Sequence, residues 1–197
     1  MVKISPFLYQ YLSVTSSSLI TLPIDILQTK TLTDKPIFFD INELKWLFLF
    51  PIIFTSQNIV FNKLNFIKSI TIRGACAGII TSPIYIYLET NKLFTRLKIF
   101  PNYTTYIRII ILRQIIFYSF LYKITFLNIK NSNFIAAFIA NSISFPIKLF
   151  ALFNSYSIFI IDKKIIRYTA ILEIIKSSIS DGIALFLIYS SYFSPLK

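Results

Sequence analysis

Three cations, Arg108, Arg113 and Lys176, are the residues whose type and position best suit them to bind a ligand, because they interrupt or adjoin apolar segments. A cation in an apolar helix is a candidate anion-binding group, and snorkelling of the side chain to a polar interface is the alternative. Both interpretations are open for Arg108 and Lys176, which lie near predicted helix starts. Arg113 lies deeper in its segment, so we expect it to help bind a small anion.

Groups for catalysis or metal binding are scarce. The chain has no histidine, three glycines and one cysteine, Cys76, which is flanked by alanines and expected to be a packing residue. Histidine, the commonest general base and the commonest metal ligand, is therefore missing. With so few glycines, no phosphate-binding glycine loop is expected. The eight acidic residues mostly fall in or near predicted loops, where we expect them to be solvated. We expect no enzymatic activity, no metal site and no cofactor.

Composition indicates a membrane protein. Of the 197 residues, 55% are hydrophobic and 14% are charged, and the mean hydropathy is +0.69. Roughly 25% charged residues is usual in soluble domains. Burying so many Phe and Ile side chains in one domain would leave little polar surface to keep it dissolved. A soluble all-helical core is the alternative, since apolar runs of this length also occur in buried helices.

Six apolar segments are expected to form helices. Several approach the roughly 20 residues that span the hydrocarbon core of a bilayer. The predicted fold is all-α, with one membrane-embedded six-helix bundle over 1–197. The segments are the charge-free runs 4–24, 46–62, 74–88, 131–147 and 182–196, and the stretch 99–127, which Arg108, Arg113 and Lys123 interrupt.

The net charge of +12 does not indicate binding to nucleic acid. The basic residues are scattered singly between apolar runs and form no stripe with interleaved aromatic residues. Cations at helix ends beside lipid headgroups are the simpler interpretation. Membrane lipids are therefore the expected surroundings, and nucleic acid is not an expected partner.

Three prolines, Pro23, Pro83 and Pro146, indicate a threefold internal repeat. They lie 60 and 63 positions apart (83 − 23 and 146 − 83), and each follows small residues with Ser or Thr close by. This period predicts three two-helix units, at approximately 5–66, 67–128 and 129–193, with a kink at each proline. Chance spacing in an unrelated six-helix membrane protein is the alternative. Because the first apolar stretch belongs to the repeat, we expect no cleavable targeting segment.

Small residues predict close helix contacts. Gly74 and Gly78 are four positions apart, as are Ala136 and Ala140, and serines are dense over 13–18. In lipid, such faces let helix backbones approach closely and let hydroxyl groups form hydrogen bonds across the contact.

These patterns resemble the repeat of the mitochondrial carrier family. The resemblance rests on GACAG at 74–78, TSP at 81–83 and aromatic residues near the ends of the even helices. In that family the odd helices end in Pro-x-[Asp/Glu]-x-x-[Lys/Arg]. The segment PIDILQTK retains Pro23 and Asp25 and has Gln28 at the basic position. The resemblance implies pseudo-threefold symmetry and a location in the inner membrane of a mitochondrion or related organelle.

The charged positions of the family's gates are largely replaced in this chain. In the family, each odd-helix acid pairs with the base of the next repeat, and here none of these pairs is a salt bridge. The even-helix ends FNKLN, FLYKI and YSSYF keep an aromatic residue but lack the acid. The resemblance therefore implies that both gate networks are missing or rebuilt. The corresponding odd-helix pairs are Asp25 with Leu88, Tyr85 with Ala151, and Lys148 with Gln28.

Two functions are compatible with these observations. The first is a carrier of a small anionic metabolite (a nucleotide, phosphate or carboxylate), for which the resemblance places Arg108 at a substrate-contact position. The prolines would then be hinges, and Asp25, Gln28 and Lys148 would be gate residues. The second is a transport-inactive structural subunit of a larger membrane complex of the respiratory or ATP synthase type. The missing gate charges favour the second, because nothing else would stabilise two alternate states.

Overall fold

The chain folds as an all-helical bundle. The computed structural model describes residues 5–33, 41–97, 101–127, 131–156 and 163–193. Within these ranges the chain forms six helices and no strand, which confirms the predicted all-α fold. The helices are α1 (Pro6–Thr33), α2 (Ile41–Lys63), α3 (Ile70–Leu97), α4 (Tyr103–Thr125), α5 (Ser132–Tyr156) and α6 (Lys163–Phe193).

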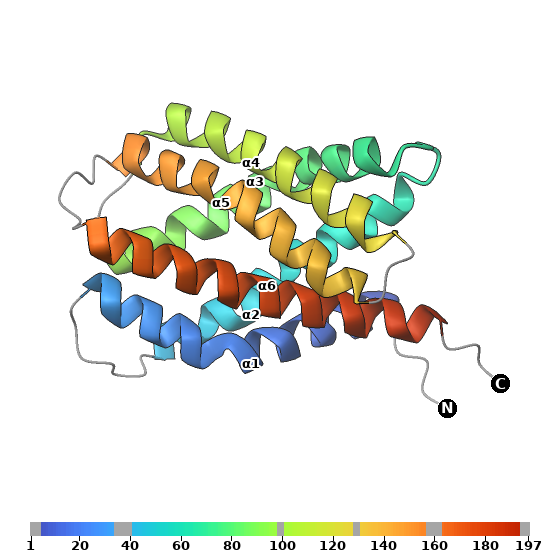
Figure 1. Ribbon diagram of the computed structural model, residues 1–197, viewed down its shortest axis with the longest axis horizontal. Coiled ribbons are helices and arrows are strands. Elements are labelled where there is room, and N and C mark those ends of the chain that lie inside the picture. Colours follow the sequence, from blue (N-terminus) through green and yellow to red (C-terminus); the bar gives the residue numbers. More distant parts are fainter. Residues whose placement is uncertain (1–4, 34–40, 98–100, 128–130, 157–162, 194–197) are drawn as a thin grey trace.

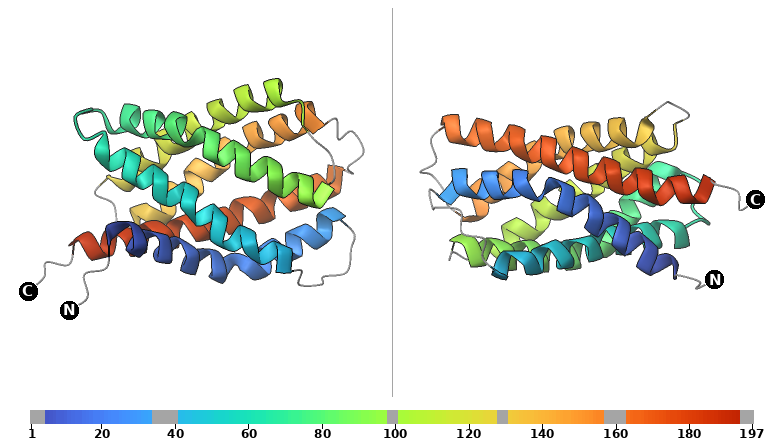
Figure 2. Two further views of the ribbon diagram at one scale, coloured as in Figure 1. Left: turned by 180° about the vertical axis from the view of Figure 1, so that it is seen from behind. Right: turned by 90° about the horizontal axis from the view of Figure 1, so that it is seen from below.

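The helices run alternately in opposite directions and form a closed ring (Figures 1 and 2). Each helix packs against the next one in the chain, and α6 packs against α1. We call the end where α1, α3 and α5 begin the first end, at the right of Figure 1, and the opposite end the second end. The predicted unit limits near 66 and 128 fall in the connections that follow α2 and α4.

Side chains in the preceding residues fix where several helices begin. The Ser5 hydroxyl accepts a hydrogen bond from the backbone N–H of Leu8 at 3.2 Å, and Pro6 occupies the first helical position of α1. The side chain of Asn102 accepts a hydrogen bond from the N–H of Thr105 at 3.4 Å at the start of α4. Such caps satisfy N–H groups that have no partner within the helix.

Several helices extend well beyond the charge-free runs. The largest difference is at α6, which begins at Lys163, whereas the predicted run begins at position 182. The charges that end these runs, Asp25, Glu89, Lys148 and Asp181, all lie within helices and none is exposed. By length and composition, one stretch of the described residues, Ser132–Ala151 in α5, is apolar enough to cross a bilayer.

The three odd helices share one burial pattern around their prolines. Pro23, Pro83 and Pro146 lie inside α1, α3 and α5 and face outward. The helices continue past them, and α5 changes direction partway along its length (Figure 1). The hydroxyl-bearing residue two positions before each proline is buried, and the residue two positions after it is buried or partly buried. The first set is Thr21, Thr81 and Ser144, and the second set is Asp25, Tyr85 and Lys148.

The α3 and α4 backbones approach closely at two glycines. A Cβ atom added at Gly74 would lie 2.5 Å from the backbone oxygen of Tyr118, and one at Gly78 would lie 2.7 Å from that of Gln114. On α5, Ala136 and Ala140 are fully buried. Gly74 and Gly78 therefore lie at a helix contact, and Ala136 and Ala140 lie in the core. Of the serines over 13–18, Ser13 and Ser17 are buried, whereas Ser16 is exposed.

Most buried hydroxyl groups form hydrogen bonds within their own helix, in contrast to the expected bonds across helices. The Thr81 hydroxyl donates to the Ala77 carbonyl oxygen at 2.8 Å, and the Ser82 hydroxyl donates to that of Gly78. Across helices, the Ser17 and Ser180 hydroxyl oxygens lie 3.4 Å apart. A hydroxyl group satisfied by its own backbone can be buried without a partner on the next helix.

Substituting Gly78→Ala should lower the free energy of unfolding by about 1–3 kcal/mol, because the new methyl group meets a backbone oxygen that cannot rotate away. This loss should exceed the gain in helix propensity of about 1 kcal/mol. Thermal or denaturant unfolding of the purified protein measures the change. Ser16→Ala, at an exposed small residue of α1, is the matched control and should be neutral. Equal stability of the two variants would contradict the close contact.

Candidate functional site

Six charged side chains form a connected network in the half of the bundle nearer the second end. Between 8% and 22% of each side-chain surface is exposed, so the charges are largely removed from solvent. We call this network the ionic circuit. Its members are Asp25 on α1, Glu89 and Lys92 on α3, Lys148 on α5, and Glu173 and Lys176 on α6.

Charge alternates around the ionic circuit. The Lys148 Nζ atom lies 3.1 Å from Glu89 Oε1 and 3.0 Å from Glu173 Oε1. The Lys176 Nζ atom lies 2.8 Å from both Glu173 Oε2 and Asp25 Oδ1. The Lys92 Nζ atom, 3.8 Å from Asp25 Oδ2, brings the chain of contacts back to α3. Three carboxylates are thus balanced by three ammonium groups, each with an opposite charge beside it.

The ionic circuit crosses the interior of the ring. Each helix packs mainly against its neighbours in the chain, so α2 separates α1 from α3, and α4 separates α3 from α5. The contacts of Lys92 with Asp25 and of Lys148 with Glu89 join these separated helices. Lys92 also lies over the ring of Phe50 on α2, 4.9 Å from its centroid. The circuit therefore joins four of the six helices, and its Lys92 also contacts α2.

The ionic circuit changes the interpretation of several residues. The expectation that the acidic residues are mostly solvated is wrong for Asp25, Glu89, Glu173 and Asp181, none of which is exposed. Lys176 is a sequence-based candidate for binding an anion, but Asp25 and Glu173 already neutralise it. Lys148 and Asp25 form salt bridges with partners other than those implied by the family pattern. The side chain of Gln28 lies outside the described residues.

A repeated short motif could have identified part of the ionic circuit. Glu89 and Lys92 are three positions apart, as are Glu173 and Lys176, and this spacing puts both charges on one side of a helix. The first pair begins six positions after Pro83 (89 − 83), whereas the family pattern places its acid two positions after the proline. The sequence contains the motif, but its pairing with Lys148 and Asp25 depends on how the helices pack.

Arg113 occupies the middle of α4 and lies outside the ionic circuit. This helix begins at Tyr103 and ends at Thr125. The guanidinium carbon of Arg113 lies 5.3 Å from the ring centroids of both Tyr85 and Phe117. No carboxylate of the described residues lies within salt-bridge distance of it.

The residue after Arg113 adds an unsatisfied polar group to the interior. Gln114 is fully buried, and neither atom of its amide has a hydrogen-bond partner in the described part of the chain. A buried amide without a partner is costly, and such a group in a native structure calls for an explanation.

Asp181 on α6 is the second inward charge outside the ionic circuit. One of its carboxylate oxygens accepts a hydrogen bond from the side-chain amide of Asn141 at 2.9 Å. Asp181 lies 12 positions before the last residue of α6 (193 − 181), and Arg113 lies 12 positions before the last residue of α4 (125 − 113). We call Arg113 and Asp181 the interior pair. Within the described ranges, neither residue forms a salt bridge with any other.

Arg108 does not join these residues. It is near the start of α4, and its side chain is exposed. A long cationic side chain near a helix end can reach a polar interface, which agrees with the snorkelling alternative. Of the three cations identified in the sequence, Arg113 is therefore the inward one without a carboxylate partner in the described structure.

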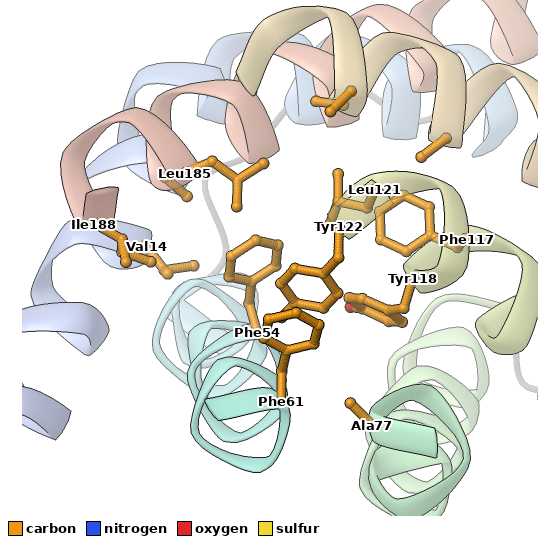
Figure 3. Packing of buried hydrophobic residues seen from close by; sticks show 14 residues of the cluster. Val14, Phe54, Phe61, Ala77, Phe117, Tyr118, Leu121, Tyr122, Leu185 and Ile188 are labelled. Carbon is orange, nitrogen blue, oxygen red and sulfur yellow. The ribbon is translucent and has the colours of Figure 1, made fainter. Parts of the chain in front are cut away.

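An aromatic cluster fills the interior near the first end. The Phe61 and Tyr122 rings stack with centroids 3.8 Å apart, and Phe126 lies 5.8 Å from Phe61 and 5.5 Å from Tyr189. The Tyr122 hydroxyl donates to the side-chain oxygen of Asn58 at 2.9 Å. Figure 3 shows Phe54, Phe61 and Tyr122 meeting between the helices. The surrounding apolar core takes residues from all six helices.

In the segment FLYKI at the end of α4, the buried aromatic residue is Tyr122 and not Phe120, with which the segment begins. Phe120 is 39% exposed, whereas Tyr122 is fully buried. The stacking of its ring on Phe61 and the hydrogen bond from its hydroxyl to Asn58 hold the Tyr122 side chain in the interior.

Comparison of the chain with known protein families, with curated proteins and with solved structures gives no match. The class defined by the fold and the interior charges is a closed six-helix bundle with an ionic circuit toward one end and an aromatic cluster toward the other.

Substituting Lys148→Met should lower the free energy of unfolding by about 3–5 kcal/mol, because it leaves buried carboxylates on Glu89 and Glu173 without their shared partner. Lys63→Met, at an exposed residue at the end of α2, is the control and should change stability by less than about 0.5 kcal/mol. Adding Glu89→Gln to Lys148→Met should restore part of the loss. Denaturant unfolding measures all three. If Lys148→Met proves as stable as the control, the ionic circuit does not hold the helices together.

Proposed function

We propose that this chain is an integral membrane protein, a six-helix carrier that moves a small solute with an anionic group through the centre of the bundle. The observation that carries the proposal is the distribution of polarity, which differs from that in a soluble helical domain. Large apolar side chains cover the outside, and charged and amide side chains share the interior with the apolar core.

Apolar side chains face outward from all six helices. On α1, the described outward residues from Pro6 to Leu27 are uncharged, over about 33 Å at 1.5 Å per residue. This length is close to the roughly 30 Å thickness of a bilayer's hydrocarbon core. Outward residues include Phe7 and Leu12 on α1, Phe48 on α2, Ile80 on α3, Leu112 on α4, Phe138 on α5 and Phe186 on α6.

The positions of the exposed charges also support membrane integration. Every exposed charged side chain in the described part of the chain lies at a helix end or within two turns of one. Such positions suit the headgroup regions on either side of a bilayer. These residues are Lys45, Lys63, Lys68, Arg108 and Lys123.

Arg113 supports the carrier proposal because it is an inward cation with no carboxylate beside it in the described structure. An ionisable group within a membrane helix is costly unless it serves a site or has a partner. Ion pairs suit a gate, since they can break and reform when helices move, and the ionic circuit joins helices that do not otherwise pack together. By resemblance to the mitochondrial carrier family, we place the protein in the inner membrane of a mitochondrion or related organelle.

The second candidate function is a transport-inactive subunit of a larger membrane complex. The aromatic cluster favours it, because Phe61, Tyr122 and their neighbours fill the interior near the first end with closely stacked rings. A permanent plug of this kind would hold the bundle in one state. Failure of the pure protein to exchange any solute, together with its co-purification in a stoichiometric complex, would support this function over the carrier.

Membrane integration is tested by extraction of cell membranes with alkaline carbonate. The chain should stay in the membrane pellet, because release would expose its outward apolar faces to water, and it should dissolve when detergent is added. A peripheral membrane protein from the same cells serves as the control and should be released. Recovery of the folded chain in the carbonate supernatant would contradict the membrane proposal.

Transport is tested in liposomes containing the purified protein. Exchange of labelled phosphate, carboxylates or nucleotides should occur, and Arg113→Gln should reduce it by about tenfold or more, since the anionic group loses its charged partner. Lys123→Gln, an exposed position on the same helix, should exchange normally. Equal rates for both variants would exclude Arg113 from the site.

A further inference from the structure

Basic residues gather at the first end of the bundle, where α2 ends, α3 begins and α4 ends. No aspartate or glutamate occurs over 1–24, 44–88, 90–161 or 182–197. These ranges include the first-end termini of all six helices. The cations at this end therefore have no carboxylate beside them, in contrast to those of the ionic circuit. We call the described ones the basic rim, and they are Lys63, Lys68, Arg73 and Lys123.

The contact between α3 and α4 places two lysines of the basic rim. The Ser119 hydroxyl donates to the backbone carbonyl oxygen of Thr71 at 3.4 Å, so these residues lie side by side on two antiparallel helices. Lys123 is one turn after Ser119, about 6 Å farther toward the first end. Lys68 precedes Thr71 by three residues, in the connection that leads into α3. Both lysines are exposed, so two cations flank the start of α3.

Arg73 lies within α3, against the end of α2. Its guanidinium carbon is 4.7 Å from the centroid of the Phe61 ring, and Lys63 follows Phe61 by two residues. The Arg73 side chain is partly buried, and its Nε–H has no hydrogen-bond acceptor within the described residues. No described carboxylate lies within salt-bridge distance of it. A guanidinium with free N–H groups beside three lysines is a binding group for an anion with several oxygens, such as a phosphate.

Apolar side chains continue from the basic rim along the outside of the bundle. Ile72 and Ile79 on α3 are 56% and 46% exposed, and their separation of seven residues puts them on one side of the helix. Leu112 on the neighbouring α4 is 50% exposed. A soluble phosphate would match the charge of the basic rim and leave this surface uncovered. A phospholipid presents a phosphate with apolar chains attached, so it matches both features.

We propose that the basic rim binds the headgroup of an anionic phospholipid, with the phosphate on Arg73 and the three lysines around it. Basic clusters beside membrane helices bind anionic headgroups in this way. The acyl chains lie along the outward apolar side chains of α3 and α4. The inference rests on the membrane integration proposed above and does not depend on transport.

The experiment measures lipid binding to the purified intact protein in detergent. Phosphatidylglycerol and phosphatidylcholine with the same acyl chains are titrated separately, and native mass spectrometry measures the bound lipid. Both lipids contain the phosphate, but only phosphatidylglycerol has a net negative charge. The wild type should bind phosphatidylglycerol at least about tenfold more tightly, since each nearby basic residue is worth about fivefold at an anionic surface.

Two variants test the basic rim. Arg73→Gln should reduce the preference for phosphatidylglycerol by about fivefold or more, because the phosphate loses its guanidinium. Combined replacement of the three exposed lysines by glutamine should reduce it to about one, and this variant keeps the inference testable if Arg73→Gln does not fold. Thermal unfolding checks each variant. The control combines Lys45→Gln with Arg108→Gln, exposed cations toward the second end, and should keep the preference.

Each outcome separates this inference from the proposed function. Equal affinities of the wild type for the two lipids, or an equal loss in the control, would show the inference to be wrong while retention in carbonate-extracted membranes still supports membrane integration. Displacement of the lipid by millimolar glycerol phosphate would assign the basic rim to a soluble phosphate and would overturn the lipid site. Release of the chain by carbonate would overturn both.

Discussion

The ionic circuit is the interaction on which the arrangement of the helices depends. It places six charges in the interior and neutralises each with an opposite charge on another helix or one turn away. An unpaired charge in such surroundings would be strongly destabilising. Because they are paired, these charged side chains can lie inside the bundle without reaching solvent. Glu173 and Lys176 lie in this way within α6, before its apolar run.

The two ends of the bundle are closed by different physical interactions. Near the first end, the aromatic cluster packs stacked rings into a continuous apolar core. Toward the second end, the ionic circuit reaches past α2 and α4 to join α1, α3 and α5. Stacked rings resist opening because separating them exposes apolar surface, whereas salt bridges can exchange partners with a charged solute. Along α6, Asp181 lies between Lys176 of the ionic circuit and Leu185 of the apolar core.

Much of the architecture follows from particular sequence features. The apolar runs predict the number of helices, and Gly74 and Gly78 predict a close helix contact. The structure shows that the partner is α4, where only a missing Cβ permits the backbone distance. The candidate site is less accessible to prediction. The depth of Arg113 in an apolar segment indicates an inward side chain. Glu89 and Glu173 each have a lysine three positions later, but nothing local indicates Lys148, the partner that they share. The three-repeat organisation and the family resemblance remain predictions.

By itself the sequence determined the helical class and the approximate positions of most helices, since these depend on local runs of residue types. Only the tertiary structure decided which charges meet. Glu89 and Lys148 are 59 positions apart (148 − 89), yet their side chains are 3.1 Å apart, because two helices that are not neighbours in the ring face each other across its interior. The sequence likewise contains Arg113 and Asp181 without relating them. The absence of a salt-bridge partner for either, among the described residues, comes from helix packing.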